Sequence, residues 1–460
     1  MALQQAYADA GYWLLRVRPA VQDLDTRNLH LRVDARTLEA IDWHGAARDK
    51  TAMSMVFGAR PAAALSQADV EQGLEQLARL RPMRVRASVL AGQAPDTVRL
   101  VLDAQPGPAP VLETWLTNRG QPRTGSIQHG VALTLYNALG LADTVSMSAT
   151  ANADLPFAGA SPSSSKHQNL HISVPWAYWL GSLQVQSAHY QTPLRSVASS
   201  LVSATGRTES ARLALEHVDY RDRTRSLRSH MAWTTMAMDN ALDWAGLERI
   251  PLTLQSRSAS KLQLGFAWQQ QQALGADRLA LELSQGVQAP GVTDPQAPAL
   301  AGRDALGRKL NVDLAWERSA RSGQGYRANV RLQVSDARLP DEDQLVLGGA
   351  DSVRGALAPM YSAATGLLLG SEWQARPHVA AADLGVWQPY IGLDWGYCAP
   401  DPGQGAGTAG EASLLGMSAG VRLHPGHASL DIGYEGILYA HPQAQGQPQE
   451  RAYFALKWTW

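Results

Sequence analysis

The segment 344–360, QLVLGGADSVRGALAPM, sets a single arginine, Arg354, among three glycines in a chain that elsewhere alternates apolar and polar residues. A guanidinium is always charged and meets a carboxylate as a two-pronged fork, so the chemistry expected of Arg354 is ion pairing. Gly348, Gly349 and Gly355 allow backbone angles that other residues disfavour, which predicts a loop hinged at Gly348 and Gly349. The residues alone leave open that Arg354 is an ordinary exposed loop side chain.

Two acidic side chains follow this loop in the sequence. Asp394 lies in the segment 389–396, PYIGLDWG, a predicted strand whose opposite face carries Ile391, Leu393 and Trp395. Glu372 comes earlier, in the strand predicted directly after the loop, and is either a second partner for a basic group or a structural residue of the same polar face.

The sequence gives little support for catalytic activity. The chain carries no G-x-S-x-G motif, no P-loop and no paired-carboxylate motif, and its 12 histidines are scattered. His424 and His427 stand in HPGH, where a solvated tight turn is favoured over a metal site. We therefore expect no enzymatic activity, no metal and no cofactor.

Composition narrows the classes of protein. A chain of 460 residues is too long for one ordinary core and predicts at least two units. The net charge is −1 and no basic stripe stands out, which argues against a nucleic-acid partner. Cys398 is the only cysteine, so an internal disulfide framework and a cysteine-rich metal site are excluded.

The sequence contains no segment that could form a membrane-spanning helix. No apolar run reaches the roughly 18 residues of a membrane-spanning helix, so any crossing would require a closed barrel. Hydrophobic residues nevertheless make up 45% of the chain, with 14 Trp and 13 Tyr. The first residues, MALQQAYADAGYWLLRVRP, lack the basic and apolar regions of a signal peptide, so an exported form would carry a different N-terminus.

The first 105 residues or so predict a small α/β unit. The segment 66–81 is its clearest helix, because Ser66 and Asp69 form an N-terminal capping pattern and apolar residues recur at helical spacing. Those apolar positions, expected to be core more than client-contacting, are Val70, Leu74, Leu77 and Leu80. Strands are predicted over 37–43, 83–90 and 96–103, a short helix over 48–58, and a proline-rich boundary over 104–110.

Beyond that boundary a period of two replaces helical spacing. In KLNVDLAWE, apolar residues at 310, 312, 314 and 316 alternate with polar ones. A soluble β-sandwich shows the same alternation. A membrane barrel of about sixteen strands is favoured because strands recur at roughly 22-residue spacing with alternating short and long connections, 191–207 among the long ones. Mid-strand charges also suit a wet lumen: Asp313, Arg331, Arg422 and Asp431. The strands read from this pattern are 128–137, 143–151, 167–174, 182–190, 208–217, 224–237, 254–268, 276–286, 309–317, 328–335, 386–397, 414–424, 428–439 and 451–460.

Several motifs together resemble one family, the two-partner secretion transporters (TpsB, haemolysin secretion/activation proteins). The most specific is LPDEDQLVLGGADSVRGALAPM, which resembles the family's long sixth loop, followed by GLDWG in the partner strand. The remaining segments that resemble family motifs are 11–33, 69–80, 117–148 and 218–227.

The resemblance implies an architecture and a set of site residues. It implies the remnant of a first POTRA domain at 1–34, a POTRA domain at 35–106 and a transmembrane β-barrel at 107–460, whose loop 337–364 folds inward. It also implies that Arg354, with Val353 and Gly355, ties the loop to Asp394 on the barrel wall, near Glu372. Ala356 stands where the family has an aromatic residue, so the loop is expected to be held by Arg354 more than by packing. Trp460 is expected to serve as the assembly signal of the barrel.

The function implied is export of a large exoprotein of haemolysin, adhesin or contact-toxin type. The expected partners are this client, bound by the POTRA domain and the lumen, the lipids of a Gram-negative outer membrane, and the barrel-assembly machinery. The POTRA domain would lie in the periplasm. Alternatives are a barrel-assembly insertase and a passive porin.

Overall fold

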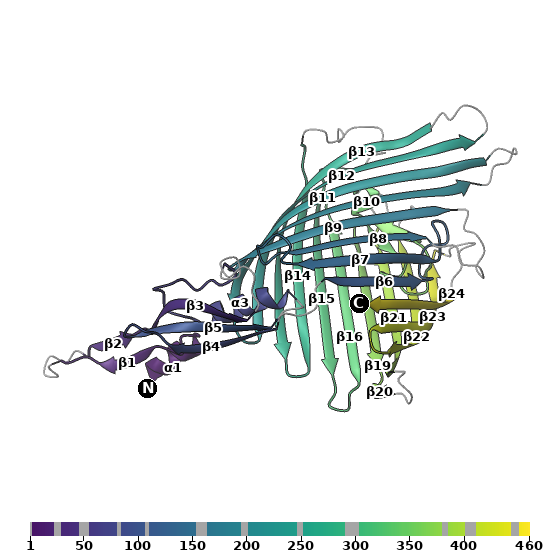
Figure 1. The fold of residues 1–460 in the computed structure, drawn as a ribbon. Helices are drawn as coiled ribbons and strands as arrows, with labels where there is room; N and C mark the ends of the chain where they lie inside the picture. Colours follow the sequence, from purple (N-terminus) through teal and green to yellow (C-terminus); the bar gives the residue numbers. More distant parts are fainter. Residues whose placement is uncertain are drawn as a thin grey trace.

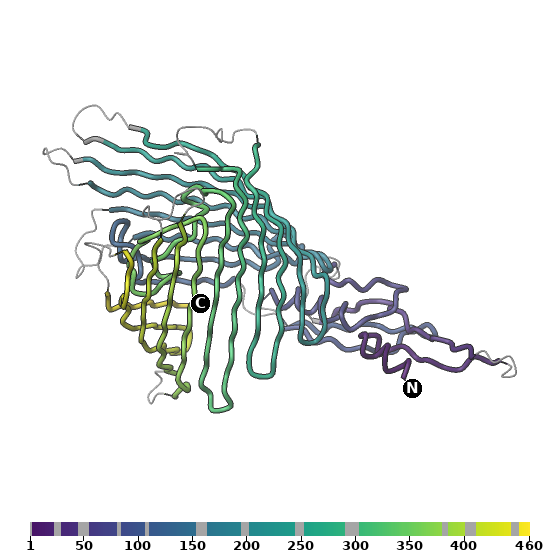
Figure 2. Tube along the Cα trace, turned by 180° about the vertical axis from the view of Figure 1, so that it is seen from behind, coloured from purple at the N-terminus to yellow at the C-terminus, as the bar shows by residue number. Residues whose placement is uncertain are grey.

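The chain folds as a closed antiparallel β-barrel with a small unit of helices and strands at one end (Figure 1). Seen from behind, this unit projects from the barrel and carries the N-terminus (Figure 2). The structure, a computed structural model, describes residues 2–22, 29–45, 55–80, 84–105, 110–152, 163–194, 201–245, 252–289, 303–379, 385–400, 411–442 and 450–460.

The N-terminal unit is built on a three-stranded sheet of order β3-β5-β4, in which β3 is parallel and β4 antiparallel to β5. A separate hairpin, β1–β2, precedes it. The predicted strands 37–43, 83–90 and 96–103 agree with this sheet, whereas most of the helix expected over 48–58 falls outside the described residues and 55–58 are not helical. The elements are α1 (Ala2–Asp9), β1 (Arg16–Pro19), β2 (Leu31–Asp34), β3 (Thr37–Gly45), α3 (Gln67–Ala78), β4 (Arg84–Ala91) and β5 (Thr97–Gln105).

Helix α3 begins as the sequence predicts. The Ser66 side chain accepts a hydrogen bond from the Asp69 backbone N–H, which satisfies one of the free donors of the first turn. Leu77 and Leu80 are buried in the core of the unit, and Val70 and Leu74 pack against it. The apolar face of α3 is therefore core, as the helical spacing indicated.

The barrel confirms the predicted fold class and strand number. Counting β19 and its short continuation β20 as one strand, since both pair with β21, the sheet closes with 16 strands. Their bounds are β6 (Val111–Thr117), β7 (Gln128–Tyr136), β8 (Thr144–Asn152), β9 (Ser164–Trp176), β10 (Trp179–Leu194), β11 (Leu201–Arg221), β12 (Arg225–Ala245), β13 (Leu252–Gln272), β14 (Gly275–Gly286), β15 (Arg308–Ser319), β16 (Gly325–Ser335), β19 (Gly366–Gln374), β20 (His378–Val379), β21 (Val386–Cys398), β22 (Ala412–His424), β23 (Ala428–His441) and β24 (Glu450–Thr459).

Two details of the strand pattern differ from expectation. The first barrel strand, β6, was not among the predicted strands, because its seven residues follow directly on the proline-rich boundary. The expected long connection 191–207 is wrong, because β10 continues to Leu194 and β11 already begins at Leu201. Strands β11, β12 and β13 each run for 21 residues, about 70 Å at 3.3 Å per residue. This side of the barrel therefore extends well beyond an apolar band of about 25 Å, as the long teal strands of Figure 1 show.

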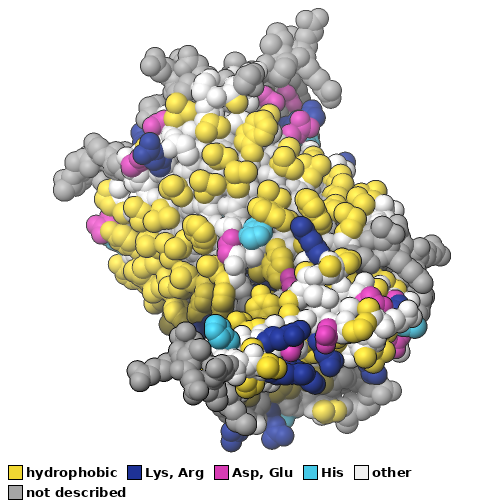
Figure 3. Space-filling model, turned by 90° about the vertical axis from the view of Figure 1, so that its left-hand side faces the viewer, with side chains coloured by type: hydrophobic (Ala, Val, Ile, Leu, Met, Phe, Trp, Pro, Cys, Tyr) yellow, Lys and Arg dark blue, Asp and Glu magenta, His cyan; other side chains and the backbone are white. Residues whose placement is uncertain are grey.

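The two faces of the wall have different chemistry. On β21, Ile391 and Leu393 are exposed on the outer surface while Tyr390 and Asp394 are buried on the inner face. The charges predicted for the lumen pair with one another: Arg331 Nε donates to Asp313 Oδ1 at 2.8 Å. Hydrophobic side chains form broad continuous fields on the surface seen in Figure 3. An apolar outer surface together with an inner face of ion pairs is the pattern of a barrel wall that separates lipid from water.

None of the helices in the described ranges is long and apolar enough to cross a membrane.

The barrel closes where β24 meets β6, over the five residue pairs Ala455–Thr117 to Thr459–Glu113. Buried Glu435 reinforces this closure, because it accepts hydrogen bonds from Arg119 (3.1 Å) beyond β6 and from Arg451 (2.7 Å) on β24. Arg451 also donates to the backbone oxygens of Asn118 and Gly120. Side chains thus supplement a short backbone ladder at this junction.

Candidate functional site

The chain between β16 and β19 forms a loop that turns back into the barrel. It contains a short 3₁₀ helix, η3 (Asp341–Asp343), and a small hairpin of β17 (Leu345–Leu347) and β18 (Tyr361–Ala363). Gly348 and Gly349 follow β17 with φ of 109° and 96°, in the left-handed region. These two glycines turn the chain at the position predicted for a hinge.

Arg354 lies at the tip of this loop and meets the barrel wall at Asp394. Its Nε donates to Asp394 Oδ2 at 2.6 Å, its second terminal nitrogen to Oδ1 at 2.7 Å, and its backbone N–H to Oδ2 at 3.0 Å. The side chains of Arg354 and Asp394 are only 15% and 5% exposed. The guanidinium is thus held as a fork on one carboxylate, the geometry in which arginine binds carboxylates most specifically.

Glu372, on the neighbouring strand β19, is a second acidic partner of the Arg354 guanidinium. Its Oε2 accepts from Arg354 at 3.0 Å, and the Ser371 carbonyl accepts from Arg354 at 2.8 Å. Arg422 of β22 binds the same Glu372 through both terminal nitrogens, at 2.6 and 2.9 Å. Arg354 of the loop and Arg422 of β22 thus alternate with Asp394 and Glu372, so no charge of the cluster lacks an opposite neighbour.

Glycines on the wall make room for the loop. A Cβ built on Gly392 would overlap the Arg354 guanidinium, and one built on Gly416 would overlap the Arg354 carbonyl oxygen. Gly355, with φ of 95°, brings its backbone against Gly436 of β23. The glycine before Asp394 in GLDWG is thus explained by the space that the guanidinium needs.

An apolar cluster also fastens the loop. Val353 and Leu347 are fully buried and Ala356 is 1% exposed, packed against wall residues that include Leu368 and Leu414. The loop is thus held by apolar contacts as well as by Arg354, and the expectation that Arg354 contributes more than packing stays a prediction. Ala356 is small, but it is buried within this cluster.

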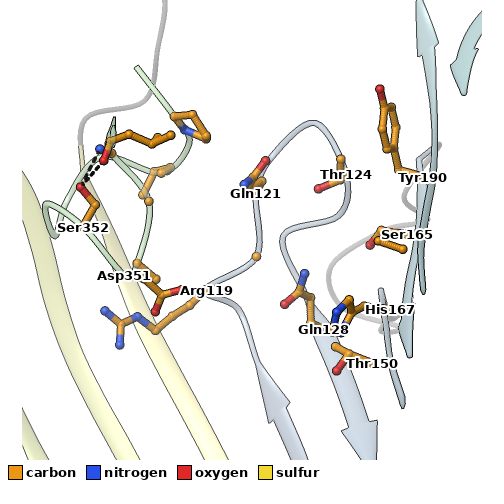
Figure 4. Close-up of a pocket in the computed structure, with 18 of the residues that line it drawn as sticks. Arg119, Gln121, Thr124, Gln128, Thr150, Ser165, His167, Tyr190, Asp351 and Ser352 are labelled. Carbon is orange, nitrogen blue, oxygen red and sulfur yellow. Dashed lines mark hydrogen bonds between the residues drawn. The ribbon is translucent and has the colours of Figure 1, made fainter. Parts of the chain in front are cut away.

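A polar cavity of about 900 Å³ lies between the loop and the wall on its other side. Figure 4 shows Asp351 and Ser352 of the loop facing Thr150, Ser165, His167 and Tyr190 across it. Hydroxyl, amide and ionic groups dominate the side chains named in this view. The loop therefore leaves part of the lumen unfilled on the side away from its tether.

The N-terminal unit contacts the barrel through α3. The side-chain amides of Gln72 and Gln76 donate to the Ala177 carbonyl in the turn between β9 and β10. Glu75 binds Arg228 of β12 at 2.7 Å and also Arg221 of β11. These ion pairs and hydrogen bonds orient the unit at the barrel end.

The turn residue Tyr178 adds a further contact to this interface. Its hydroxyl donates to Asp69 at 2.9 Å. Burial, together with the Asp69 carboxylate, raises the pKa of the Tyr178 hydroxyl, which stays protonated as the donor.

Other predicted residues lie apart from the loop. Trp460 is exposed, and its backbone N–H donates to the Leu112 carbonyl of β6 at 2.8 Å. His424, the first residue of the predicted HPGH turn, ends β22, and His427 lies in the turn that follows. Within the part of the chain that the structure describes, no group of three or more His, Cys, Asp or Glu side chains could hold a metal ion.

Sequence reasoning missed Arg422, Gly392 and Gly416 as site residues, as well as the acids 341–343. Arg422 had been noted only as a lumen charge. The alternation of β22 puts Arg422 on the inner face, but its approach to Glu372 depends on a pairing register that one sequence does not reveal.

Comparison with known proteins identifies the family and the fold of this chain. A family model described as haemolysin secretion/activation protein ShlB/FhaC/HecB matches residues 96–423. The chain is 26% identical over 442 residues to the outer membrane transporter CdiB-2 of Burkholderia pseudomallei, covering 94% of this chain and 72% of that protein. It is 25% identical to the outer membrane transporter CdiB of Escherichia coli O6:K15:H31, covering 93% and 70%. The solved structure of CdiB from Escherichia coli superposes with a TM-score of 0.88 at 23% identity, covering 100% of this chain and 83% of that one, which shows the shared fold.

Proposed function

This chain belongs to the haemolysin secretion/activation protein family ShlB/FhaC/HecB, and from that premise we propose that it exports one large exoprotein through its barrel lumen. It is an outer-membrane transporter of the two-partner secretion type. The client is an exoprotein of haemolysin, adhesin or contact-toxin type. The similarity of this chain to the CdiB transporters favours a client of the contact-toxin type.

The observation that carries the proposal is the loop that Arg354 fastens inside the lumen. The loop, residues 337–364, occupies one side of the lumen, and the polar cavity of about 900 Å³ occupies the other. We assign Arg354, Asp394 and Glu372 the role of a tether that holds the loop beside the path of the client. Val353 and Gly355 seat the tether, and Gly348 and Gly349 act as its hinge.

The N-terminal unit receives the client in this proposal. Residues 35–106 act as a POTRA domain in the periplasm, 1–34 as the end of a preceding one, and 107–460 as the barrel. In the described residues β4 pairs only with β5, so its other edge is open for an extended segment to add as a further strand. The ion pairs of Glu75 with the barrel keep this edge at the lumen entrance.

Catalysis has no part in the proposal. Folding of the client outside the cell supplies the driving force. Outer-membrane lipids surround the barrel, and the barrel-assembly machinery inserts it, with Trp460 as the signal. Family membership favours export over the barrel-assembly insertase, and the tethered loop favours it over the passive porin.

Secretion in cells with and without this chain tests the proposal. A Gram-negative host expresses the chain together with a large exoprotein encoded beside it, and the exoprotein is measured in the medium and in the periplasm. We expect it in the medium only when the chain is present. Equal release without the chain, or retention in the periplasm with it, would contradict the proposal.

A further inference from the structure

Near its start the inward loop carries three consecutive acids, Asp341, Glu342 and Asp343, which form η3 and are called the acidic foot here. Each acid meets a basic side chain of the wall near the end of the barrel away from the N-terminal unit. The pairs are Asp341 with Arg303, Glu342 with Arg257, and Asp343 with Lys261 and Lys309. Four bases from β13, β15 and the segment before β15 thus face three acids of the loop.

The central pair of the foot is almost completely buried. The side chains of Arg257 and Glu342 are 3% and 9% exposed. Within the described residues, the Nε and one terminal nitrogen of Arg257 have no hydrogen-bond partner, so Glu342 is the group that compensates this guanidinium. A buried charge without an opposite neighbour is strongly unfavourable, which makes departure of the foot from Arg257 costly.

Asp343 joins the foot to two more strands. Its carboxylate binds Lys261 of β13 and lies 3.1 Å from Lys309 Nζ of β15. Its backbone carbonyl accepts from Lys309 at 3.0 Å and from Gln333 of β16 at 2.9 Å. Gln333 also donates to the Ala364 carbonyl at 3.0 Å, so one side chain holds both ends of the loop together.

The foot and the Arg354 tether share no side chain. The foot rests on β13 and β15, whereas the tether rests on β19 and β21. We propose that the acidic foot is a fastening independent of the tether, and that the loop leaves the lumen only when foot and tether are both released. Release of Arg354 alone then leaves the loop in the lumen, held at its base by β13 and β15.

This inference rests on the proposed function only in linking loop position to export, so its test measures loop position without a client. Asp351, exposed on the loop in the cavity, is replaced by cysteine as a reporter. Intact cells are treated with a large membrane-impermeant maleimide, and the labelling rate is compared with that of the chain lacking the reporter, whose Cys398 is buried.

The test variant of the foot is Glu342→Gln with Asp343→Asn. We expect it to raise the labelling rate about tenfold, which is 1.4 kcal/mol. The matched control is Asp313→Asn, which removes a lumen ion pair with Arg331 on the neighbouring strand and leaves the rate unchanged. Asp394→Asn raises the rate by itself, and the combined variant gives the product of the two factors, because independent sites add in free energy.

Heat-modifiable migration on gels shows which variants contain a folded barrel. If the foot variant does not fold, the charge exchange Lys261→Glu with Asp343→Lys is measured instead. It is expected to label more slowly than Asp343→Lys alone, and not fully at the parental rate because Lys309 still faces position 343. A wild-type rate in the foot variant, or a combined variant no faster than Asp394→Asn alone, would overturn the proposal. Failure of wild-type cells to secrete the client would instead contradict the proposed function and leave these rates interpretable.

Discussion

Arg354 and Asp394 form a two-pronged ion pair across 40 positions of the chain, with N···O distances of 2.6 and 2.7 Å. The pair joins the tip of a loop to the middle of a barrel strand, so it fixes the loop in space and not only in sequence. Because both side chains are nearly buried, the pair is expected to contribute more than the ~0–1 kcal/mol of a surface salt bridge.

Asp394→Ala and Arg354→Ala are each expected to reduce secretion sharply while the barrel still reaches the outer membrane. Removing one partner leaves the other buried and uncompensated, at a cost of about 3 kcal/mol or more. Secreted client and the amount of heat-modifiable barrel are measured together. Exchange of the charges, Arg354→Asp with Asp394→Arg, is the matched control and is expected to restore part of the export. Normal secretion by both single variants would exclude the tether role.

Gly392→Ala tests whether the glycines of the wall exist to seat the arginine. The added methyl group would overlap the Arg354 guanidinium, so the tether is displaced and secretion falls as in Asp394→Ala. Gly181→Ala is the matched control in another barrel strand, since its Cβ would meet only the Val174 carbonyl at 3.9 Å. Equal secretion by the two variants would show that the guanidinium does not need the space beside Gly392.

Glu435→Gln probes the junction between the first and last strands. Glu435 is 1% exposed and neutralises Arg119 and Arg451, so the substitution is expected to destabilise the barrel by about 3 kcal/mol. The exposed pair Lys457–Glu113 bridges the same strands, and Glu113→Gln should cost less than about 1 kcal/mol. The temperature at which the heat-modifiable form is lost measures both. A smaller loss for Glu435→Gln than for Glu113→Gln would exclude the buried cluster as the main support.

Much of this architecture could be predicted from the sequence, because its signals are local. The helix over 66–81 carries its own cap, and the barrel strands carry a period of two. The contacts of the loop are not local in this sense. Arg422 reaches Glu372 over 50 positions and Arg257 reaches Glu342 over 85, through pairing registers that a single sequence does not specify.

The packing around Ala356 is likewise not local in sequence. One side chain in the motif is small, but Val353, Leu347 and Leu414 come together around it from three different segments. Packing of this kind becomes visible only when the fold is known.

Glu75→Gln is expected to loosen the N-terminal unit from the barrel without unfolding either part. Glu75 is the only acid that pairs with Arg221 among the described residues, and it also pairs with Arg228. Spin labels on β4 and on the β11–β12 turn report the spread of distances between the two parts, which we expect to broaden. Glu113→Gln, remote from this interface, serves as the control. An unchanged distance distribution would show that the remaining contacts of the interface, such as Tyr178 with Asp69, orient the unit without Glu75.

Acid is expected to open the turn between β4 and β5 through Glu39. A hydrogen bond from the Thr97 side chain, with others from the backbone N–H groups of Ala94 and Gln93, lowers the pKa of this carboxyl below its ordinary 4.5. The folded state therefore binds this proton less readily than the unfolded chain, so the contribution of Glu39 to stability is present above the ordinary pKa and is lost as pH falls through the lowered one. Hydrogen exchange of residues 93–97 should accelerate in that range relative to the neighbouring β5 amides. Glu39→Gln should exchange rapidly at neutral pH and respond little to acid, and an acid response that persists in Glu39→Gln would assign the effect to another group.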